Sequence, residues 1–216
     1  MKKYILINFI TLLFANVSSF AQKIISEGTI IYSIKIKNID KANTIIDSAT
    51  STIYLKGPLS RTDMVNSLGN ETTIYNAKTG SAVILKQYSG QKLMITLTKE
   101  NRDNKYNKYD GIIFKPATET KNIKGYVCKQ AIAQLKNGTT FSVYYTPDIN
   151  VVNKEYDPVF KTLPGLPIQY EFVKGNLSFS YTISSLDFNT ISSVKFDIPK
   201  SGYRVMTYEE SEQNKN

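Results

Sequence analysis

The side chains that most often carry chemistry in proteins are scarce in this chain. The sequence of 216 residues contains no histidine and a single cysteine, Cys128. Without histidine, the chain lacks the commonest general base, the usual zinc ligand and every Ser–His or Cys–His pair. Because Cys128 has no second cysteine nearby, it is poorly suited to thiol catalysis or redox exchange. We expect it to be buried on a strand, as free cysteines usually are, rather than reactive or linked to a partner.

Carboxylates are the remaining side chains that could support acid–base or metal chemistry. Asp103, Asn107 and Asp110 in DNKYNKYDG resemble part of a calcium-binding loop. The third position of that loop is Lys105 and no glutamate stands at the twelfth, so the pattern fails and indicates a solvated loop. An enzyme that uses carboxylates alone would need two of them in one cleft, and nothing in the sequence places such a pair together. We therefore predict no catalytic residue, no metal site and no cofactor.

The N-terminal segment is typical of an export signal. Two lysines precede an apolar run from Tyr4 to Val17, which is too short to span a bilayer, and the small residues Ser19 and Ala21 follow it. These are the positions that a signal peptidase reads. We predict a signal peptide over residues 1–21, cleaved after Ala21, rather than an uncleaved membrane anchor. A periplasmic location follows from this prediction.

The remainder of the chain is long enough for one hydrophobic core. We predict a single β-rich domain over residues 22–210, a disordered tail over 211–216, and a monomer. The 27 lysines and arginines outnumber the 18 acidic residues, which gives a net charge of +9. The lysines are dispersed and form no block of five or six, so we expect no nucleic-acid partner. Peripheral contact with an anionic membrane surface is consistent with such a charge.

Alternating hydrophobic residues predict strands along most of the chain. In Gly28 to Lys37, Ile30, Tyr32, Ile34 and Ile36 share one face, and polar residues occupy the other. Further strands are expected at residues 52–56, 60–65, 72–76, 81–88, 92–98, 168–173 and 177–185. The tyrosines at core parity in such strands favour core packing over stacking on bases.

A hairpin is predicted near the middle of the sequence. Its arms, Gly125 to Lys136 and Thr139 to Thr146, flank Asn137-Gly138, a dipeptide that tolerates the positive φ values of tight turns. Cys128 lies in the first arm.

Helices are expected to be few and short. In residues 147–163, Asp157-Pro158 resembles an N-cap followed by proline at the first helical position. Residues 207–216 open with acidic side chains that suit a helix N-terminus, whereas the charged, aperiodic segment 99–110 is expected to be a loop. Ten or more strands with one or two short helices predict a mainly β fold with minor α content, built on one strongly curved antiparallel sheet.

Four sequence segments resemble a known group of families. They are EGTIIYSIKI near the predicted mature N-terminus, ETKNIKGYVCKQA in the middle, LPGLPIQYEF at Leu163 to Phe172, and FDIPKSGYRVMTYEE at the end. The chain resembles the GLPGLI family and related exported, uncharacterised families of Bacteroidetes-type bacteria. The GLPGLI signature itself is altered, because either Leu163 stands in place of its first glycine or Pro167 interrupts it. These families look like members of the outer-membrane lipoprotein carrier (LolA/LolB-like) superfamily. The resemblance implies a half-barrel with an apolar concave side and no catalytic residues.

The number of apolar strand positions exceeds what two short helices can cover. We therefore expect an exposed groove on the concave side that binds a hydrophobic ligand or a lipidated protein, in the manner of a lipoprotein carrier and without enzymatic activity. The alternative is a structural or interaction module of the cell envelope with a closed core and no ligand. Strand parity gives eight candidate lining residues: Ile34, Ile36, Phe141, Val143, Tyr170, Phe172, Phe179 and Tyr181.

Overall fold

The computed structural model describes residues 22–41 and 44–213. The expected signal peptide lies outside the described residues. The strands are β1 (Lys23–Ile25), β2 (Glu27–Asn38), β3 (Thr44–Lys56), β4 (Leu59–Asn66), β5 (Gly69–Asn76), β6 (Ala82–Tyr88), β7 (Gln91–Leu97), β8 (Ile113–Ile123), β9 (Tyr126–Gln134), β10 (Thr140–Thr146), β11 (Ile149–Val151), β12 (Leu166–Lys174), β13 (Leu177–Asp187) and β14 (Arg204–Thr207). The helices are α1 (Lys99–Tyr106) and α2 (Tyr208–Gln213), with short 3₁₀ turns η1 (Asn107–Tyr109), η2 (Lys154–Tyr156) and η3 (Ser193–Phe196).

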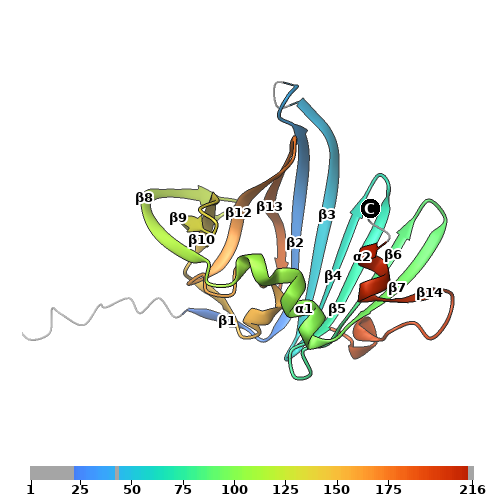
Figure 1. Ribbon diagram of the computed structural model, residues 1–216. Helices are drawn as coiled ribbons and strands as arrows, with labels where there is room; N and C mark the ends of the chain where they lie inside the picture. The colour runs from blue at the N-terminus through green and yellow to red at the C-terminus, as the bar shows by residue number, and fades with distance from the viewer. Residues whose placement is uncertain (1–21, 42–43, 214–216) are drawn as a thin grey trace, which may run out of the picture.

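Twelve of these strands form one curved sheet that does not close on itself, in the order β14-β7-β6-β5-β4-β3-β2-β13-β12-β10-β9-β8. Strands β2 to β7 follow one another as antiparallel neighbours, and β13 returns to pair with β2. The β8–β10 end curls over the hollow of the sheet (Figure 1). The predicted mainly β fold with a curved sheet is confirmed. The sheet is mixed rather than purely antiparallel, because β14 pairs with β7 in parallel, and β1 and β11 form a separate parallel pair.

The predicted central hairpin is present as β9 and β10, which pair in register without a shift from Gln134↔Thr140 to Lys129↔Tyr145. Only the glycine of its turn, Gly138, has a positive φ, at 86°. A single left-handed glycine is what a turn with one extra residue requires, whereas a two-residue turn would need two such positions.

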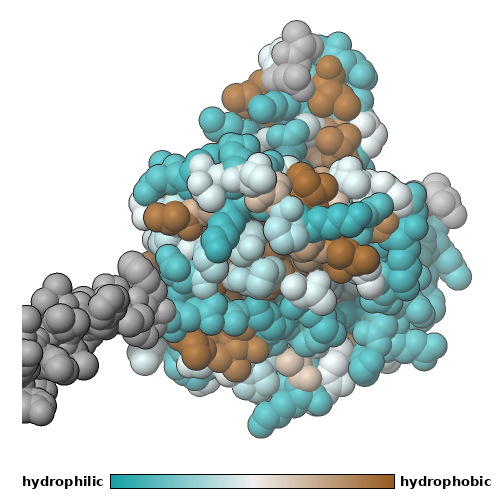
Figure 2. Space-filling model, turned by 90° about the vertical axis from the view of Figure 1, so that its left-hand side faces the viewer, coloured by the Kyte–Doolittle hydropathy of each residue, from teal (hydrophilic) through white to brown (hydrophobic). Residues whose placement is uncertain are grey.

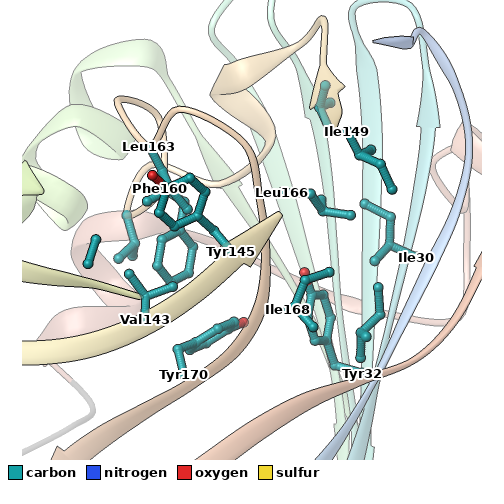
Figure 3. Close-up of a cluster of buried hydrophobic side chains, with 14 of the residues drawn as sticks. Ile30, Tyr32, Val143, Tyr145, Ile149, Phe160, Leu163, Leu166, Ile168 and Tyr170 are labelled. Carbon is teal, nitrogen blue, oxygen red and sulfur yellow. The ribbon is translucent and has the colours of Figure 1, made fainter. Parts of the chain in front are cut away.

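The main core lies between the concave face of the sheet and residues 149–163, which cross that face and which we call the crossing segment. Tyr32 of β2 is 1 % exposed, and its hydroxyl donates to the carbonyl oxygen of Pro167 over 2.7 Å. Figure 3 shows Phe160 and Leu163 of the crossing segment beside Val143 of β10. Burying each of these apolar side chains contributes about 1.5–3 kcal/mol. This core fixes how β2, β10 and β12 approach one another.

Helix α1 lies where a loop was expected. Its first turn is closed by a capping box: the side chain of Thr98 accepts from the backbone N–H of Asn101, and the side chain of Asn101 accepts in return from the N–H of Thr98. Such reciprocal bonds satisfy N–H groups that have no partner within the helix. Arg102 then anchors α1, because its guanidinium lies 3.8 Å from the ring centre of Tyr75. The helix crosses in front of the hollow of the sheet (Figure 1).

The helix expected within residues 147–163 is not formed. Strand β11, η2 and a turn occupy this stretch instead. The side chain of Asp157 accepts from the N–H of Val159 over 3.0 Å, and the N–H of Phe160 bonds to the carbonyl of Asp157. Asp157 therefore caps a single turn, and Pro164-Gly165 then directs the chain into β12. The C-terminal helix expected from the acidic residues is present as α2. It includes residues 211–213 of the predicted tail.

The other face of the sheet is partly covered as well. Phe196 of η3 packs against Ile74, Val83 and Leu85, so β6 is buried on both sides. Exposed hydrophobic residues are dispersed over the rest of the surface, where separate hydrophobic areas are set among hydrophilic ones (Figure 2). Those on the projecting end of the β2–β3 hairpin are Ile39, Ile45 and Ile46.

Candidate functional site

An aromatic groove opens on the concave side of the sheet, over strands β10, β12 and β13. We call it the outer groove. Its volume is about 470 Å³. Aromatic side chains from three neighbouring strands line it: Phe141 from β10, Phe172 from β12, and Phe179 and Tyr181 from β13. The other lining residues belong to η1, the β9–β10 turn and strands β10 and β12: Lys108, Tyr109, Leu135, Asn137, Thr139, Thr140, Glu171, Val173 and Lys174.

A second cavity of about 220 Å³ lies between the sheet on one side and α1 and the turn after η2 on the other. We call it the inner pocket. Its walls come from β3, β4, β5, β12 and β13 on the sheet side, and from α1 and the turn after η2 on the other. The lining residues are Ser51, Ile53, Thr62, Met64, Glu71, Thr73, Tyr106, Tyr156, Asp157, Pro158, Tyr170, Phe172 and Tyr181. Phe172 and Tyr181 line both cavities, which are therefore neighbours.

The rings between the two cavities pack against one another. Tyr170 and Tyr181 stack with centroids 4.6 Å apart and planes inclined by 14°. Phe141 meets Phe172 edge to face at 4.8 Å, and Phe172 meets Tyr181 in the same manner at 6.1 Å. Aromatic pairs of this geometry each contribute about 0.5–1.5 kcal/mol beyond burial. The cluster thus holds the shared wall in a defined shape.

The residues proposed from strand parity divide into two groups. Phe141, Phe172, Phe179 and Tyr181 meet in the outer groove, and Tyr170 lines the inner pocket together with Phe172 and Tyr181. The structure brings these five together.

The remaining three, Ile34, Ile36 and Val143, line neither cavity. Val143 is fully buried in the main core. Ile34 and Ile36 pair in register with Tyr181 and Phe179 and are buried in a cluster that both of these rings contact. Parity placed all three on the correct face of the sheet. It could not show that neighbouring side chains cover them.

Several lining residues lie on segments that the sequence pattern did not mark as part of a site. Tyr106, Lys108 and Tyr109 belong to the charged stretch interpreted as a loop, and Asp157 was interpreted as a helix cap. The tyrosines stand three residues apart in an otherwise polar segment, which is the spacing of one helical face. That spacing was the available signal that the segment packs against something.

The inner pocket contains two carboxylates in different environments. Desolvation raises the pKa of Asp157 to about 6, although the N–H groups of Val159 and Phe160 and the charge of Arg102 oppose the shift. Glu71 forms an ion pair with Lys86 at 3.4 Å. Burial also raises the pKa of Tyr181 to about 12, so its hydroxyl is protonated at neutral pH. The pKa of Asp157 therefore lies close to the physiological range.

Two further findings describe the chain between residues 22 and 213. Across its described ranges, no three histidine, cysteine, aspartate or glutamate side chains come together in a way that could hold a metal ion. Among the helices of those same ranges, none has the length and hydrophobicity needed to cross a membrane. Cys128 is fully buried, as expected.

Comparisons with known proteins concern the fold. No protein-family model matches the chain, and no curated protein matches it. Among solved structures, PNGF-II aligns with a TM-score of 0.50 and 15 % identity, over 87 % of this chain and 33 % of that one. MucB aligns with a TM-score of 0.44 and 8 % identity, over 84 % of this chain and 60 % of MucB. The β-barrel-like protein of domain of unknown function DUF1849 from Brucella abortus aligns with a TM-score of 0.33 and 8 % identity, over 78 % of this chain and the whole of that one.

The chain spans about one third of PNGF-II and three fifths of MucB. At 15 % identity, the likeness to PNGF-II shows that a similar curved β fold exists there, and it transfers no activity or ligand.

Proposed function

We propose that this chain is an exported, periplasmic, non-enzymatic protein that binds an amphiphile, either a lipid or a lipidated protein, in the outer groove. One observation carries the proposal: Phe141, Phe172 and Phe179 converge from three strands on an open groove of about 470 Å³. Ligand sites usually measure about 300–1,000 Å³ and are lined by apolar and aromatic side chains with a few polar groups. The outer groove meets both criteria.

The same groove favours ligand binding over a closed structural module. A module of that kind would fill its concave side with side chains, as the main core does around Tyr32. Here the β13 rings are only half-buried, and η1 stops beside the groove without filling it. Open apolar surface of this size is costly to leave in water, so its retention supports a ligand.

The surroundings of the groove are compatible with the proposed family and location. We propose membership of the GLPGLI-like exported families within the lipoprotein-carrier superfamily on the residues already given. Lys108 and Lys174 line the groove, and exposed isoleucines project from the end of the β2–β3 hairpin. Basic and apolar side chains together support peripheral contact with an anionic membrane surface, from which an amphiphile would be taken.

A direct experiment is to purify the chain from its native periplasm and identify bound molecules by mass spectrometry after extraction. Displacement of a fluorescent fatty acid then compares the wild type with Phe179→Ser. The matched control is Phe188→Ser, because Phe188 is exposed, lines neither cavity and contacts Lys23. We expect a lipid in the extract, and weaker probe binding in Phe179→Ser alone. Repeated absence of any lipid, together with equal probe binding by both variants, would refute the proposal.

A second candidate function rests on the two carboxylates of the inner pocket. Glu71 is held beside Lys86, whereas the pKa of Asp157 is raised to about 6. A carboxyl group with a raised pKa can act as the general acid of glycoside hydrolysis, and a second carboxylate in the same pocket can act as base or nucleophile. Chromogenic glycosides test this function, because turnover that Asp157→Asn abolishes would support it and absence of turnover would favour the binding protein.

A further inference from the structure

The inner pocket and the outer groove differ in the charges that they present. The charged side chains that line the inner pocket are the carboxylates of Glu71 and Asp157, and its lining contains neither lysine nor arginine. The outer groove carries Lys108 and Lys174 against the single carboxylate of Glu171. In a chain with nine more basic than acidic residues, the charged residues that line the inner pocket are thus all acidic.

The carboxylate of Asp157 is the less compensated of the two. Glu71 has Lys86 beside it at 3.4 Å. Arg102, the cation that influences Asp157, is directed mainly elsewhere: its guanidinium packs over Tyr75 and donates to the carbonyl of Glu155 over 2.5 Å. Asp157 lies half-buried at the pocket wall. One carboxylate therefore faces a cavity that is large enough to admit a small cationic group.

Tyrosine is the most frequent residue type in the rest of the lining. Four of the thirteen residues are Tyr106, Tyr156, Tyr170 and Tyr181, which come from α1, η2, β12 and β13. The face of an aromatic ring attracts cations, and several rings together form the recognised environment for quaternary ammonium groups. A carboxylate in the same cavity adds direct charge attraction. Neither an anionic head group nor a bare alkyl chain matches this combination of side chains.

We propose that the inner pocket binds the alkylammonium head of an amphiphile whose hydrocarbon chain lies in the outer groove. This inference rests on the proposed function and specifies its ligand class. Phe172 and Tyr181 line both cavities, so the cavities lie side by side, and in this proposal the link between head and chain passes over these two rings. The reverse orientation would place an anionic head beside Lys108 and Lys174, and it makes the opposite prediction about charge.

The experiment uses three amphiphiles with the same chain and different heads: dodecyltrimethylammonium, dodecyldimethylamine oxide and dodecanoate, each below its critical micelle concentration. Calorimetry measures their affinities for the mature wild-type chain at pH 7.5. We expect the trimethylammonium compound to bind about tenfold more tightly than the amine oxide, which has nearly the same shape and no net charge. Equal affinities, or tighter binding of dodecanoate, would overturn the inference.

Variants assign the preference to the pocket. Asp157→Asn keeps an oxygen that can accept from the N–H of Val159, so the local turn is retained, and we expect it to reduce the preference for the trimethylammonium head to about twofold. Asp148→Asn is the matched control, because Asp148 is exposed and lines neither cavity. An undiminished preference in Asp157→Asn would also contradict the inference. If none of the three compounds binds the wild type, the proposed function itself fails, which is a distinct result.

Discussion

Replacing Asp157 by asparagine should stabilise the protein above pH 7, although it removes a hydrogen-bonding carboxylate. Burial raises the pKa of Asp157 from 3.8 to about 6. A difference of about two pKa units corresponds to about 3 kcal/mol at about 1.4 kcal/mol per unit. Because the side chain is half-buried, solvent screening reduces this value, and the weaker hydrogen bond of a neutral amide subtracts about 1 kcal/mol more. We therefore expect a net gain of about 1 kcal/mol.

The sign of the effect depends on pH in a defined way. The folded pKa of Asp157 exceeds the unfolded one, so this group favours the folded state below about pH 4, and that contribution is lost as the pH rises through about 6. Asparagine does not titrate. The difference in unfolding free energy between Asp157→Asn and the wild type should thus be near zero or slightly negative at pH 4, increase between pH 4 and 6, and remain constant above pH 7.

Urea unfolding at pH 4, 5, 6 and 8 measures this difference. Far-ultraviolet circular dichroism is a suitable probe because the chain has no tryptophan. Asp148→Asn serves as the control, since its exposed side chain should leave the difference close to zero at every pH. A difference between Asp157→Asn and the wild type that does not vary with pH would refute the assignment of a raised pKa to this carboxylate.

Three further predictions concern the framework of the site. Tyr32→Phe leaves a buried backbone carbonyl of β12 without its donor, so thermal and urea unfolding should show a loss of about 1–3 kcal/mol; no loss would mean that water replaces the hydroxyl. At Gly165 an added Cβ would lie 2.2 Å from a carbonyl oxygen of β10, so Gly165→Ala should destabilise the protein. Gly125→Ala is the control, because its Cβ would meet no atom within 4 Å and the left-handed φ alone costs about 1 kcal/mol. Gly165→Ala should show the larger loss in urea unfolding, and equal losses would contradict the steric argument. Cys128 is fully buried and desolvation raises its pKa, so a thiol reagent should label it only after unfolding, and rapid labelling of the native chain would show that β9 opens.

The sheet could be predicted because its signal is local. A strand alternates with a period of two residues, and Ile30, Tyr32, Ile34 and Ile36 obey that period and are all buried. Turn glycines separate the strands at the expected places. The parallel addition of β14 to β7 could not be foreseen, because it joins residues more than 100 positions apart through a connection without periodicity.

The candidate site could be predicted only on its sheet side. Parity identifies the face to which Phe172 or Ile36 points, whereas the packing of α1 and the turn at Asp157 decides which of these side chains remain open. Helix α1 has a mostly polar sequence, and its place is determined by contacts such as Arg102 on Tyr75. A contact between such distant residues leaves no pattern in either segment. The four lining residues that α1, η2 and the following turn contribute, of thirteen in all, could therefore not be assigned from the sequence.

One part of the pocket nevertheless had a sequence signal, in the inward positions of β4 and β5. Thr62 pairs with Thr73, and Met64 pairs with Glu71. These side chains share the concave face of the sheet with Ile53 of β3 and Tyr75 of β5. Polar side chains on the concave face of a sheet are costly to bury against an apolar cover. Where they occur in neighbouring strands, the cover must stand away from the sheet or supply polar partners. Tyr106, Tyr156 and Asp157 form the wall opposite these strands and leave a cavity between, so polar groups line it from both sides, as the proposed polar, cationic end of the ligand requires.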